Sequence, residues 1–434
     1  MEIIDNYVTN PTRWDGVKMK RVSNCFKPYK GLPMSIYIIF FASIINNMGN
    51  FVGPFLTMFL TYRIGISISL VGVIVAVNAG LGMIGTMIGG KLIDSIGRKK
   101  VLVVFGIAGA VGYGICAFIN NPIIITSILM VSSFVGGFSH PVYSTITTDL
   151  TKGDQRNAAF SLNYMAMNIG FSVGPLLAGF LYENYLMWFF LGDAITTFMS
   201  IALVSIFVPE SKPTKEEVEK SKTETNESAE EGNLIKALLK RPTLLMFSFI
   251  IVIYFIVFSQ FTFGLSIQIG DIFKNNGPTI FGSLMTVNAV MCSVLTIFIT
   301  SATKNIKASL CIAIGGLLYA VGFGMMFFID AYYMFILSAA TWTVGEILVA
   351  TNTSVYIASQ TPITHRGRFN SVFPIIRKLG FMIGPMMAGF YVKYTSIRNL
   401  WILVAILALI ASLMMYRLYT VDRIKIEVIQ NKTA

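Results

Sequence analysis

Three charged side chains lie inside long apolar stretches of this sequence. Glu346 stands about 22 Å from the start of its stretch, at about 1.5 Å per helical residue. Arg377 and Lys378 lie in the next stretch, and either could neutralise Glu346. A charge in the middle of a bilayer costs several kcal/mol unless it is paired or hydrated. Glu346 is therefore either a carboxylate that takes up a proton or a cationic substrate, or one half of a static ion pair.

The remaining polar candidates are one further acid and several amides. Asp193 lies nearer to an end of its stretch, and we favour a structural role for it over a proton-carrying one. Asn46 and Asn50 are four residues apart, so they share a face if that stretch is one helix. With Tyr254 and Gln260 from a later stretch, they are candidates to line a substrate cavity. The alternative is that these amides hold helices together.

The elements that must position these side chains are membrane-spanning helices. Of the 434 residues, 55% are hydrophobic and only 12% are charged, whereas a soluble domain has roughly 25% charged residues. A helix needs about 17–25 mostly apolar residues to cross a bilayer, while a barrel strand needs only about ten, strictly alternating in polarity. Twelve stretches are long enough for helices: 34–61, 68–90, 101–120, 123–148, 157–182, 186–208, 243–267, 280–301, 308–328, 331–359, 370–393 and 399–419. We predict an all-α polytopic membrane protein.

The twelve stretches form two groups of six on either side of a polar segment. The predicted division is an N-terminal segment at 1–33, a six-helix lobe at 34–208, a linker at 209–242, a second six-helix lobe at 243–420 and a tail at 421–434. The linker is rich in Lys, Glu, Thr, Ser and Asn, which favours a solvated or disordered connection between the lobes.

One segment occurs in both halves. Residues 170–180 return as residues 380–390, with the same residue at seven of eleven positions. Internal duplication in a polytopic membrane protein is typical of transporters, in which two bundles move around a central site. Small residues four apart allow close helix contact, and Pro bends a helix. We expect packing between the lobes from the following residues: Gly170, Gly174, Pro175, Gly179, Gly380, Gly384, Pro385 and Gly389.

The 33 Lys and Arg residues are distributed unequally between the two ends of the predicted helices. If the N-terminus is cytoplasmic, the loops on the opposite face hold only four of them: Arg63, Lys274, Lys393 and Arg398. This asymmetry follows the positive-inside rule and predicts that both termini are cytoplasmic. The net charge of +12 is therefore a topology signal, and we expect no nucleic-acid partner.

The loop between the second and third stretches has charged residues and glycines at fixed spacing. It runs Gly89-Gly90-Lys91-Leu92-Ile93-Asp94-Ser95-Ile96-Gly97-Arg98-Lys99-Lys100. Gly89 and Gly90 would let another helix approach closely, and Gly97 permits a turn with positive φ. Asp94 and Arg98 can pair across one helical turn. A carboxylate such as Asp94 also stabilises a helix N-terminus by about 0.3–1 kcal/mol.

This loop resembles the gating motif of the major facilitator superfamily. The residues that fill the motif are Gly90, Leu92, Asp94, Gly97, Arg98 and Lys99. The resemblance implies a twelve-helix fold of two pseudo-symmetric lobes, and it implies that Asp94 docks on the eleventh helix. That helix is expected to begin near Asn370-Ser371, since both residues are good N-caps. The alternative is a simple topology anchor.

The repeated segment also resembles the fifth-helix signature of the drug/proton antiporter branch, in which a series of glycines ends in Gly-Pro and further small residues. The sequence departs from that branch in its fourth stretch, where Ser132 stands at the position of an Arg common in proton-coupled members. We therefore expect a secondary active transporter that works by alternating access and exports small amphiphilic or drug-like compounds in exchange for protons. The alternatives are a facilitator or an exporter of lipid-like molecules or metabolites without tight proton coupling and, less favoured, a membrane receptor or enzyme.

Partners and cofactors follow from this interpretation. We expect a small-molecule substrate, protons, the lipid bilayer of a cell membrane and a monomeric state. The four cysteines are scattered without metal-ligand spacing, so neither a metal nor a cofactor is expected, and no catalytic motif of a known enzyme class is found.

Overall fold

The computed structural model describes residues 29–212, 242–360 and 366–433, and within these ranges the regular structure is entirely helical. The first half contains α3 (Met34–Met48), α4 (Val52–Met58), η2 (Phe59–Arg63), α5 (Ile68–Ile96), α6 (Arg98–Val101), η3 (Leu102–Gly106), α7 (Ile107–Cys116), α8 (Pro122–Gly137), α9 (Val142–Leu150), α10 (Gly153–Asn184) and α11 (Leu186–Phe207). The second half contains α14 (Pro242–Phe258), η4 (Ser259–Phe261), α15 (Gly264–Phe273), η5 (Lys274–Asn276), α16 (Gly277–Thr303), α17 (Ala308–Met325), α18 (Tyr332–Gln360), α19 (Arg366–Tyr394) and α20 (Ile397–Thr433).

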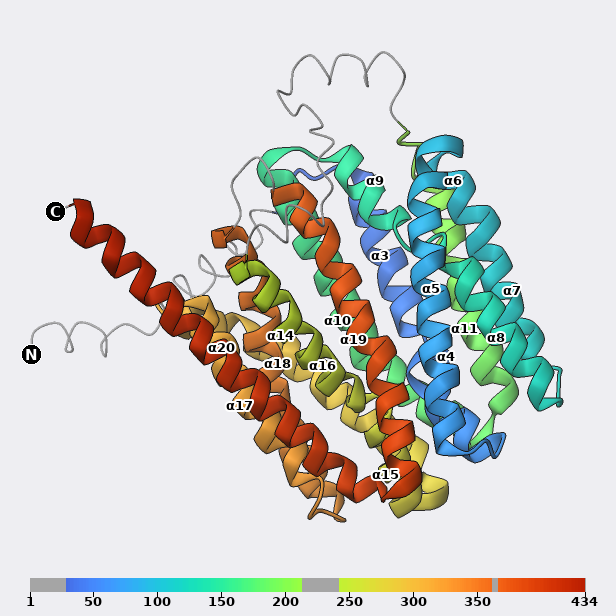
Figure 1. Cartoon of the computed structure of the whole chain (residues 1–434). Helices are drawn as coiled ribbons and strands as arrows, with labels where there is room; N and C mark the ends of the chain where they lie inside the picture. The colour runs from blue at the N-terminus through green and yellow to red at the C-terminus, as the bar shows by residue number, and fades with distance from the viewer. Residues whose placement is uncertain (1–28, 213–241, 361–365, 434) are drawn as a thin grey trace, which may run out of the picture.

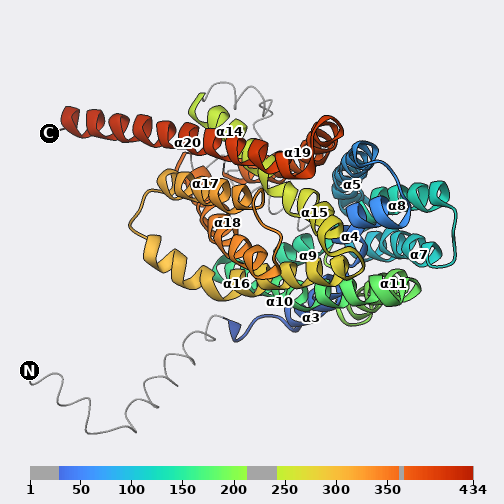
Figure 2. The ribbon, with the colours of Figure 1, turned by 90° about the horizontal axis from the view of Figure 1, so that it is seen from below.

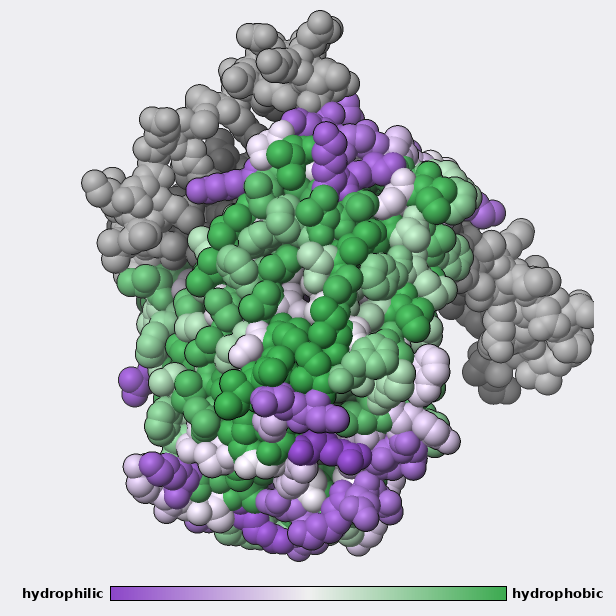
Figure 3. Space-filling view, turned by 90° about the vertical axis from the view of Figure 1, so that its right-hand side faces the viewer, coloured by the Kyte–Doolittle hydropathy of each residue, from purple (hydrophilic) through white to green (hydrophobic). Residues whose placement is uncertain are grey.

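These helices agree with the twelve predicted crossings. Eleven helical segments of the described chain are long and apolar enough to span a bilayer. One of them, Thr243–Thr303, has 61 residues and reverses direction at η5, so it contains two crossings. Lys274 has a φ of 51° at this reversal. Apolar side chains cover the middle of the molecular surface and polar side chains gather at its two ends, as the space-filling view shows (Figure 3).

The two halves of the chain form two groups of helices that lie side by side (Figures 1 and 2). Contacts between the groups run along α10 with α16 and along α5 with α19. We call the end that holds the α5–α6 junction, at the top of Figure 1, the basic end, and the end that holds η2 and η5 the opposite end.

Two crossings are interrupted at equivalent positions of the repeat. The first crossing breaks between α3 and α4, at Gly49-Asn50-Phe51. The seventh narrows to a 3-10 helix at Ser259–Phe261, and position 50 plus the repeat offset is position 260. The first break separates Asn46 from Asn50, so the expectation that they share one helical face is wrong.

Candidate functional site

Glu346 of α18 is held by side chains of α16. The Asn288 amide donates a hydrogen bond of 2.7 Å to Oε2 of Glu346, and the Cys292 thiol donates a longer one of 3.6 Å to the same oxygen. The same Asn288 amide donates to the Thr343 hydroxyl at 3.0 Å. Oε1 of Glu346 has no hydrogen-bond partner in the described chain and is not among its occluded unpaired atoms. One oxygen of the carboxylate is therefore anchored, and the other is unpaired in the described chain without being fully occluded.

The static ion pair with a neighbouring cation, one of the two alternatives for Glu346, is not formed in the described part of the chain. The Arg377 guanidinium lies over the rings of Phe255 and Phe381, at 5.5 Å and 5.9 Å from their centroids. The Lys378 ammonium donates a hydrogen bond of 2.9 Å to the Thr86 hydroxyl of α5 instead. Phe381 lies one helical turn from Arg377 on α19, whereas the contacts with Phe255 of α14 and Thr86 of α5 depend on the packing of other helices and do not follow from helical spacing.

Asp193 lies at the break in the first crossing. Its Oδ2 accepts hydrogen bonds from the backbone N–H groups of Phe51 and Val52, at 3.0 Å and 2.9 Å. The carboxylate thus caps the N-terminus of α4 from α11, although the two elements are 141 residues apart. This is the geometry of a structural residue, and it explains why the first crossing is broken at this point.

The four amide and phenol candidates do not surround one open cavity. Tyr254 is buried, and its hydroxyl donates to the Ile312 carbonyl at 3.0 Å. Gln260 is buried as well, with its amide directed to Ile256 and Ser259 of its own helix. The Asn46 amide points to Thr197 of α11 at 3.5 Å, and Asn50 is partly buried at the helix break. The expectation that Tyr254 and Gln260 line a cavity is wrong for this conformation, because both are packed inside their own lobe.

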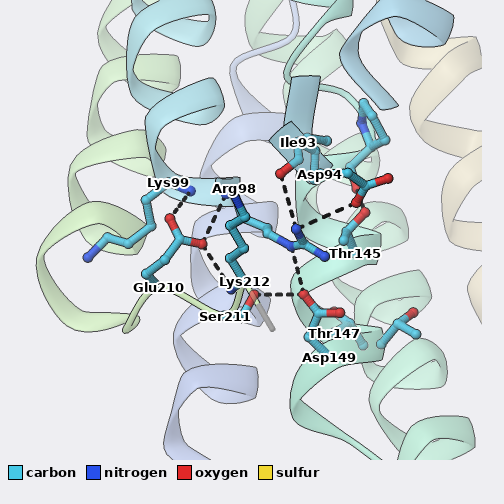
Figure 4. A network of polar contacts seen from close by, with 12 residues as sticks. Ile93, Asp94, Arg98, Lys99, Thr145, Thr147, Asp149, Glu210, Ser211 and Lys212 are labelled. Atoms are coloured by element: carbon cyan, nitrogen blue, oxygen red, sulfur yellow. Dashed lines mark hydrogen bonds and ion pairs between the residues drawn. The ribbon is translucent and has the colours of Figure 1, made fainter. Parts of the chain in front are cut away.

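The loop at the basic end is organised around the buried guanidinium of Arg98 (Figure 4). Nε of Arg98 pairs with Asp149 at 2.9 Å, and Nη1 donates to the Ile93 carbonyl at 3.1 Å. Asp94 lies 3.5 Å from Nη1, as its spacing predicts, but its side chain is 77% exposed. Gly97 has a φ of 103°, which confirms the predicted turn with positive φ. Arg98 therefore joins α5, α6 and α9, while Asp94 remains available at the surface.

Glu210 completes this network, and the sequence analysis assigned it no role. Its carboxylate accepts backbone N–H bonds from Arg98, Lys99 and Lys212, at 3.0, 3.1 and 3.1 Å (Figure 4). Burial raises the pKa of Glu210, but these backbone bonds outweigh it, so the pKa lies below its usual value. Ser211 donates to Asp149 at 2.9 Å. The sequence feature that indicates this site is the acidic residue just after the sixth apolar stretch.

Two details of the predicted gate differ from expectation. A Cβ atom added at Gly90 would meet nothing within 4 Å, whereas one added at Gly89 would overlap the backbone of Phe138. Gly89 therefore provides the close helix contact and Gly90 does not. The eleventh crossing, α19, begins at Arg366, so Asn370 and Ser371 lie inside the helix and are not its N-caps.

The repeated glycine-proline segments face two different neighbours. Gly170 and Gly174 lie against α3, and Gly380 and Gly384 lie against the seventh crossing near its 3-10 turn. These four glycines pack within their own lobes, so packing between the lobes is not their role in this structure. The prediction failed because a helix with small residues on two faces can pack closely against two neighbours. The sequence alone does not determine which neighbour each face contacts.

The ends of the repeated segments do face the other lobe, and they do so symmetrically. A Cβ atom at Gly282 of α16 would overlap the Pro175 carbonyl, and one at Gly72 of α5 would overlap the Pro385 carbonyl. Gly179 lies against Pro278 and Thr279, and Gly389 lies against Ile68, Ser69 and Gly72.

Polar contacts join the lobes at the opposite end. Glu183 of α10 accepts a hydrogen bond of 2.9 Å from the backbone N–H of Thr279, in the first turn of α16. The Tyr62 hydroxyl of η2 approaches Asp271 of α15 at 2.7 Å and donates to the Ile267 carbonyl at 2.6 Å. We call the contacts of Pro175, Gly179 and Glu183 with α16, together with the contact between Tyr62 and Asp271, the opposite-end seal.

Replacing Gly282 by Ala is expected to weaken the opposite-end seal, because the added methyl group cannot fit beside the Pro175 carbonyl. Overpacking of this kind typically costs about 1–3 kcal/mol, which corresponds to a shift of about fivefold to about 150-fold between conformers. The check is the distance between probes placed on the two lobes at this end. Gly90→Ala is the matched control, since its methyl group meets only open space. Equal probe distances in both variants would remove Gly282 from the seal.

Comparison with known proteins agrees with this geometry. The sequence model of the Major Facilitator Superfamily matches residues 38–273 and 255–433. The uncharacterized MFS-type transporter YttB of Bacillus subtilis (strain 168) is 24% identical over 394 residues, which are 88% of this chain and 94% of the relative. A Na(+), Li(+), K(+)/H(+) antiporter of Planococcus maritimus is 23% identical over 77% of this chain and 83% of its own. The quinolone resistance protein NorA of Staphylococcus aureus (strain Mu50 / ATCC 700699) is 29% identical over 39% of this chain and 45% of its own.

Solved structures show the same fold. A POT family transporter in complex with a thioalcohol-conjugated peptide superposes with a TM-score of 0.74 at 15% identity, covering 90% of this chain and 97% of that one. At this identity the likeness establishes the fold alone.

Proposed function

The chain belongs to the Major Facilitator Superfamily of membrane transporters, and from this premise we propose that it exports small amphiphilic compounds in exchange for protons. The mechanism is alternating access, in which two lobes expose a central site to one side of the membrane at a time. The relatives near the drug/proton antiporter branch support this reading, and the finer assignment is ours.

The observation that carries the proposal is the half-anchored carboxylate of Glu346. Asn288 and Cys292 fix Oε2 and leave Oε1 open. An ionisable residue inside a membrane protein marks a substrate or proton path by default. A carboxylate with one free oxygen can accept a proton or pair with a cationic substrate, but not both at once. Proton–substrate exchange requires that the proton and the substrate exclude each other in this way.

The basic end is proposed to be the cytoplasmic end, because it carries most of the Lys and Arg residues. The lobe boundaries at 34–208 and 243–420 and the cytoplasmic termini are part of the same proposal. The opposite-end seal then lies on the outer side, and we propose that this conformation of the transporter is closed to the outside. Asp94 is exposed in this conformer. We propose that it docks on the N-terminus of α19 when the basic end closes, where the helix dipole favours a negative charge.

A second candidate, exchange of alkali cations for protons, is favoured by one observation. The Glu346 carboxylate and the Thr343 hydroxyl lie close together, since one Asn288 amide nitrogen donates to both, and such oxygens suit hard cations. The Planococcus maritimus relative is named for this activity. Many proton-coupled exporters have an Arg at the position of Ser132. Ser132 is buried in α8, so this position carries no positive charge.

The deciding experiment uses the full chain reconstituted in lipid vesicles with an imposed pH gradient. Fluorescent lipophilic cations, fluorescent lipids and the chlorides of Na⁺, Li⁺ and K⁺ are added in separate arms, with internal pH followed by a trapped dye. Accumulation of a lipophilic cation that depends on the gradient is the expected result. Proton release driven by an alkali salt alone would support the second candidate, and substrate movement that ignores the gradient would indicate a facilitator.

A further inference from the structure

We propose that α16 transmits the charge state of Glu346 to the opposite-end seal, with Asn288 as the positioning residue that makes the connection. This inference rests on the proposed function, because it takes Glu346 as the group that binds the proton or the cationic substrate. It adds a mechanical route from that group to a gate on the other lobe.

The first step is that α16 provides one side of the seal. Its first turn offers the Thr279 N–H to the Glu183 carboxylate. One turn later, Gly282 lies against the Pro175 carbonyl, and Gly179 lies against Pro278. A carboxylate at a helix N-terminus and a close backbone contact both depend strongly on distance. A small displacement of α16 therefore weakens both contacts together.

The second step is that α16 also anchors Glu346. Asn288 is buried, and its amide joins α16 to α18 through two hydrogen bonds, one to Glu346 and one to Thr343. Cys292 adds a weaker donor one turn further along. Both side chains act as donors to one carboxylate oxygen. This arrangement suits the ionised carboxylate, since hydrogen bonds to a charged acceptor are about twice as strong as neutral ones.

The third step is that the two sets of contacts are close together on one unbroken helix. Gly282 and Asn288 are six residues apart, about 9 Å along the helix axis. α16 is continuous from Gly277 to Thr303, and its one proline, Pro278, lies in the first turn. The first and seventh crossings, by contrast, are interrupted near their middles. Motion at Asn288 is therefore transmitted to Gly282 without a hinge between them.

The consequence is a lock that depends on charge. While Glu346 is ionised and unliganded, its bonds to Asn288 and Cys292 hold α16 against α18, and the opposite-end seal stays closed. A proton or a cationic substrate at Oε1 withdraws charge from Oε2 and weakens these bonds. The lobes can then move. An unloaded carrier stays locked, which prevents the proton leak that an antiporter must avoid.

The charged and titratable groups that face Glu346 come from several elements. They are Cys292 of α16, Tyr319 of α17, Arg377 of α19 and Tyr164 of α10. Only Asn288 and Cys292 hydrogen-bond to the carboxylate in the described chain, so the connection to the seal runs through α16.

The test measures seal opening directly in the full chain. Spin labels are placed at Asn184→Cys and Asn275→Cys, which lie on the two walls of a cavity of about 650 Å³ at the opposite end. Cys25 is replaced by Ser, and the buried Cys116, Cys292 and Cys311 are kept. Distances are recorded in lipid at about pH 8 and about pH 6. In the parent, acidification should increase the open population by about tenfold, as loss of a charge-assisted bond implies.

Asn288→Ala should show the open population at both pH values and little further response. Asn352→Ala is the matched control, because the amide of Asn352 bonds only within α18 in the described chain. It should keep the full pH response.

Two outcomes separate this inference from the proposed function. If Asn288→Ala keeps the parent's full pH response, the route through α16 is wrong, whatever Glu346 does in transport. If Glu346→Gln leaves gradient-driven transport intact in the vesicle assay, the proposed function fails first. Loss of transport in Glu346→Gln together with a normal pH response in Asn288→Ala would keep the proton site and discard the coupling.

Discussion

Replacing Glu346 by Gln should abolish accumulation of substrate driven by a pH gradient, and it should weaken binding of a cationic substrate because the amide carries no charge to pair with it. Gln has nearly the shape of the protonated acid, and its amide oxygen can still accept from Asn288 and Cys292. It cannot release a proton, so one half of the exchange cycle is missing. We expect gradient-driven accumulation to fall to the level of vesicles without the protein, because the exchanged proton then has no carrier. The measurement is uptake into everted vesicles with and without the gradient, beside equilibrium binding of the same fluorescent cation.

The control for Glu346→Gln is an acid-to-amide change elsewhere. Asp330 forms an exposed ion pair with Arg398 at the opposite end, and such surface pairs contribute little. Asp330→Asn should transport at the parental rate. Full gradient-driven transport by Glu346→Gln would reduce Glu346 to a structural residue. The coupling question would then move to Asp193, the other buried intramembrane acid, whose bonds to Phe51 and Val52 would have to break in another conformer.

The helices could be predicted from the sequence because hydropathy and bilayer thickness determine them locally. The sixth stretch was predicted at 186–208, and α11 is Leu186–Phe207. The ninth was predicted at 308–328, and α17 is Ala308–Met325. The gating loop was predictable for the same reason: the turn at Gly97 and the pairing of Asp94 with Arg98 depend on residues within one helical turn.

Contacts between distant residues could not be predicted. The break in the first crossing depends on Asp193, far along the chain, which competes for the N–H groups that a continuous helix would use internally. The partner of Glu346 is the amide of Asn288 on α16. A single Asn in an apolar stretch does not indicate which residue of another helix its side chain will contact. The glycines at 170 and 179 belong to one motif but meet α3 and the start of α16 respectively, because the orientation of a helix between two neighbours is a tertiary property.

Arg98→Ala and Asp94→Asn are expected to fail for different reasons, although both residues belong to one motif. Arg98 is 5% exposed and holds the partly buried Asp149, the Ile93 carbonyl and Asp94 together. Its removal leaves Asp149 with only the Ser211 hydroxyl as a donor in the described chain. Breaking such a pair typically costs about 3–5 kcal/mol. Arg98→Ala should therefore lower the thermal stability of the purified protein markedly and reduce its yield in the membrane.

Asp94→Asn should leave stability unchanged, since an exposed i,i+4 pair contributes only about 0.3–0.5 kcal/mol. It should reduce transport by about two- to fivefold, which corresponds to about 0.3–1 kcal/mol for a carboxylate at a helix N-terminus. The loss of transport arises in the conformer whose basic end is closed. There the Asp94 carboxylate is proposed to dock on the N-terminus of α19, and an amide lacks the charge for this interaction. Thermal melting in detergent and transport by vesicles, measured on the same preparations, separate the two effects. Lys100→Ala, an exposed neighbour in the same loop, should match the parent in both assays. If Asp94→Asn transports at the parental rate, the loop serves as a structural joint built on Arg98, and the gate must lie elsewhere.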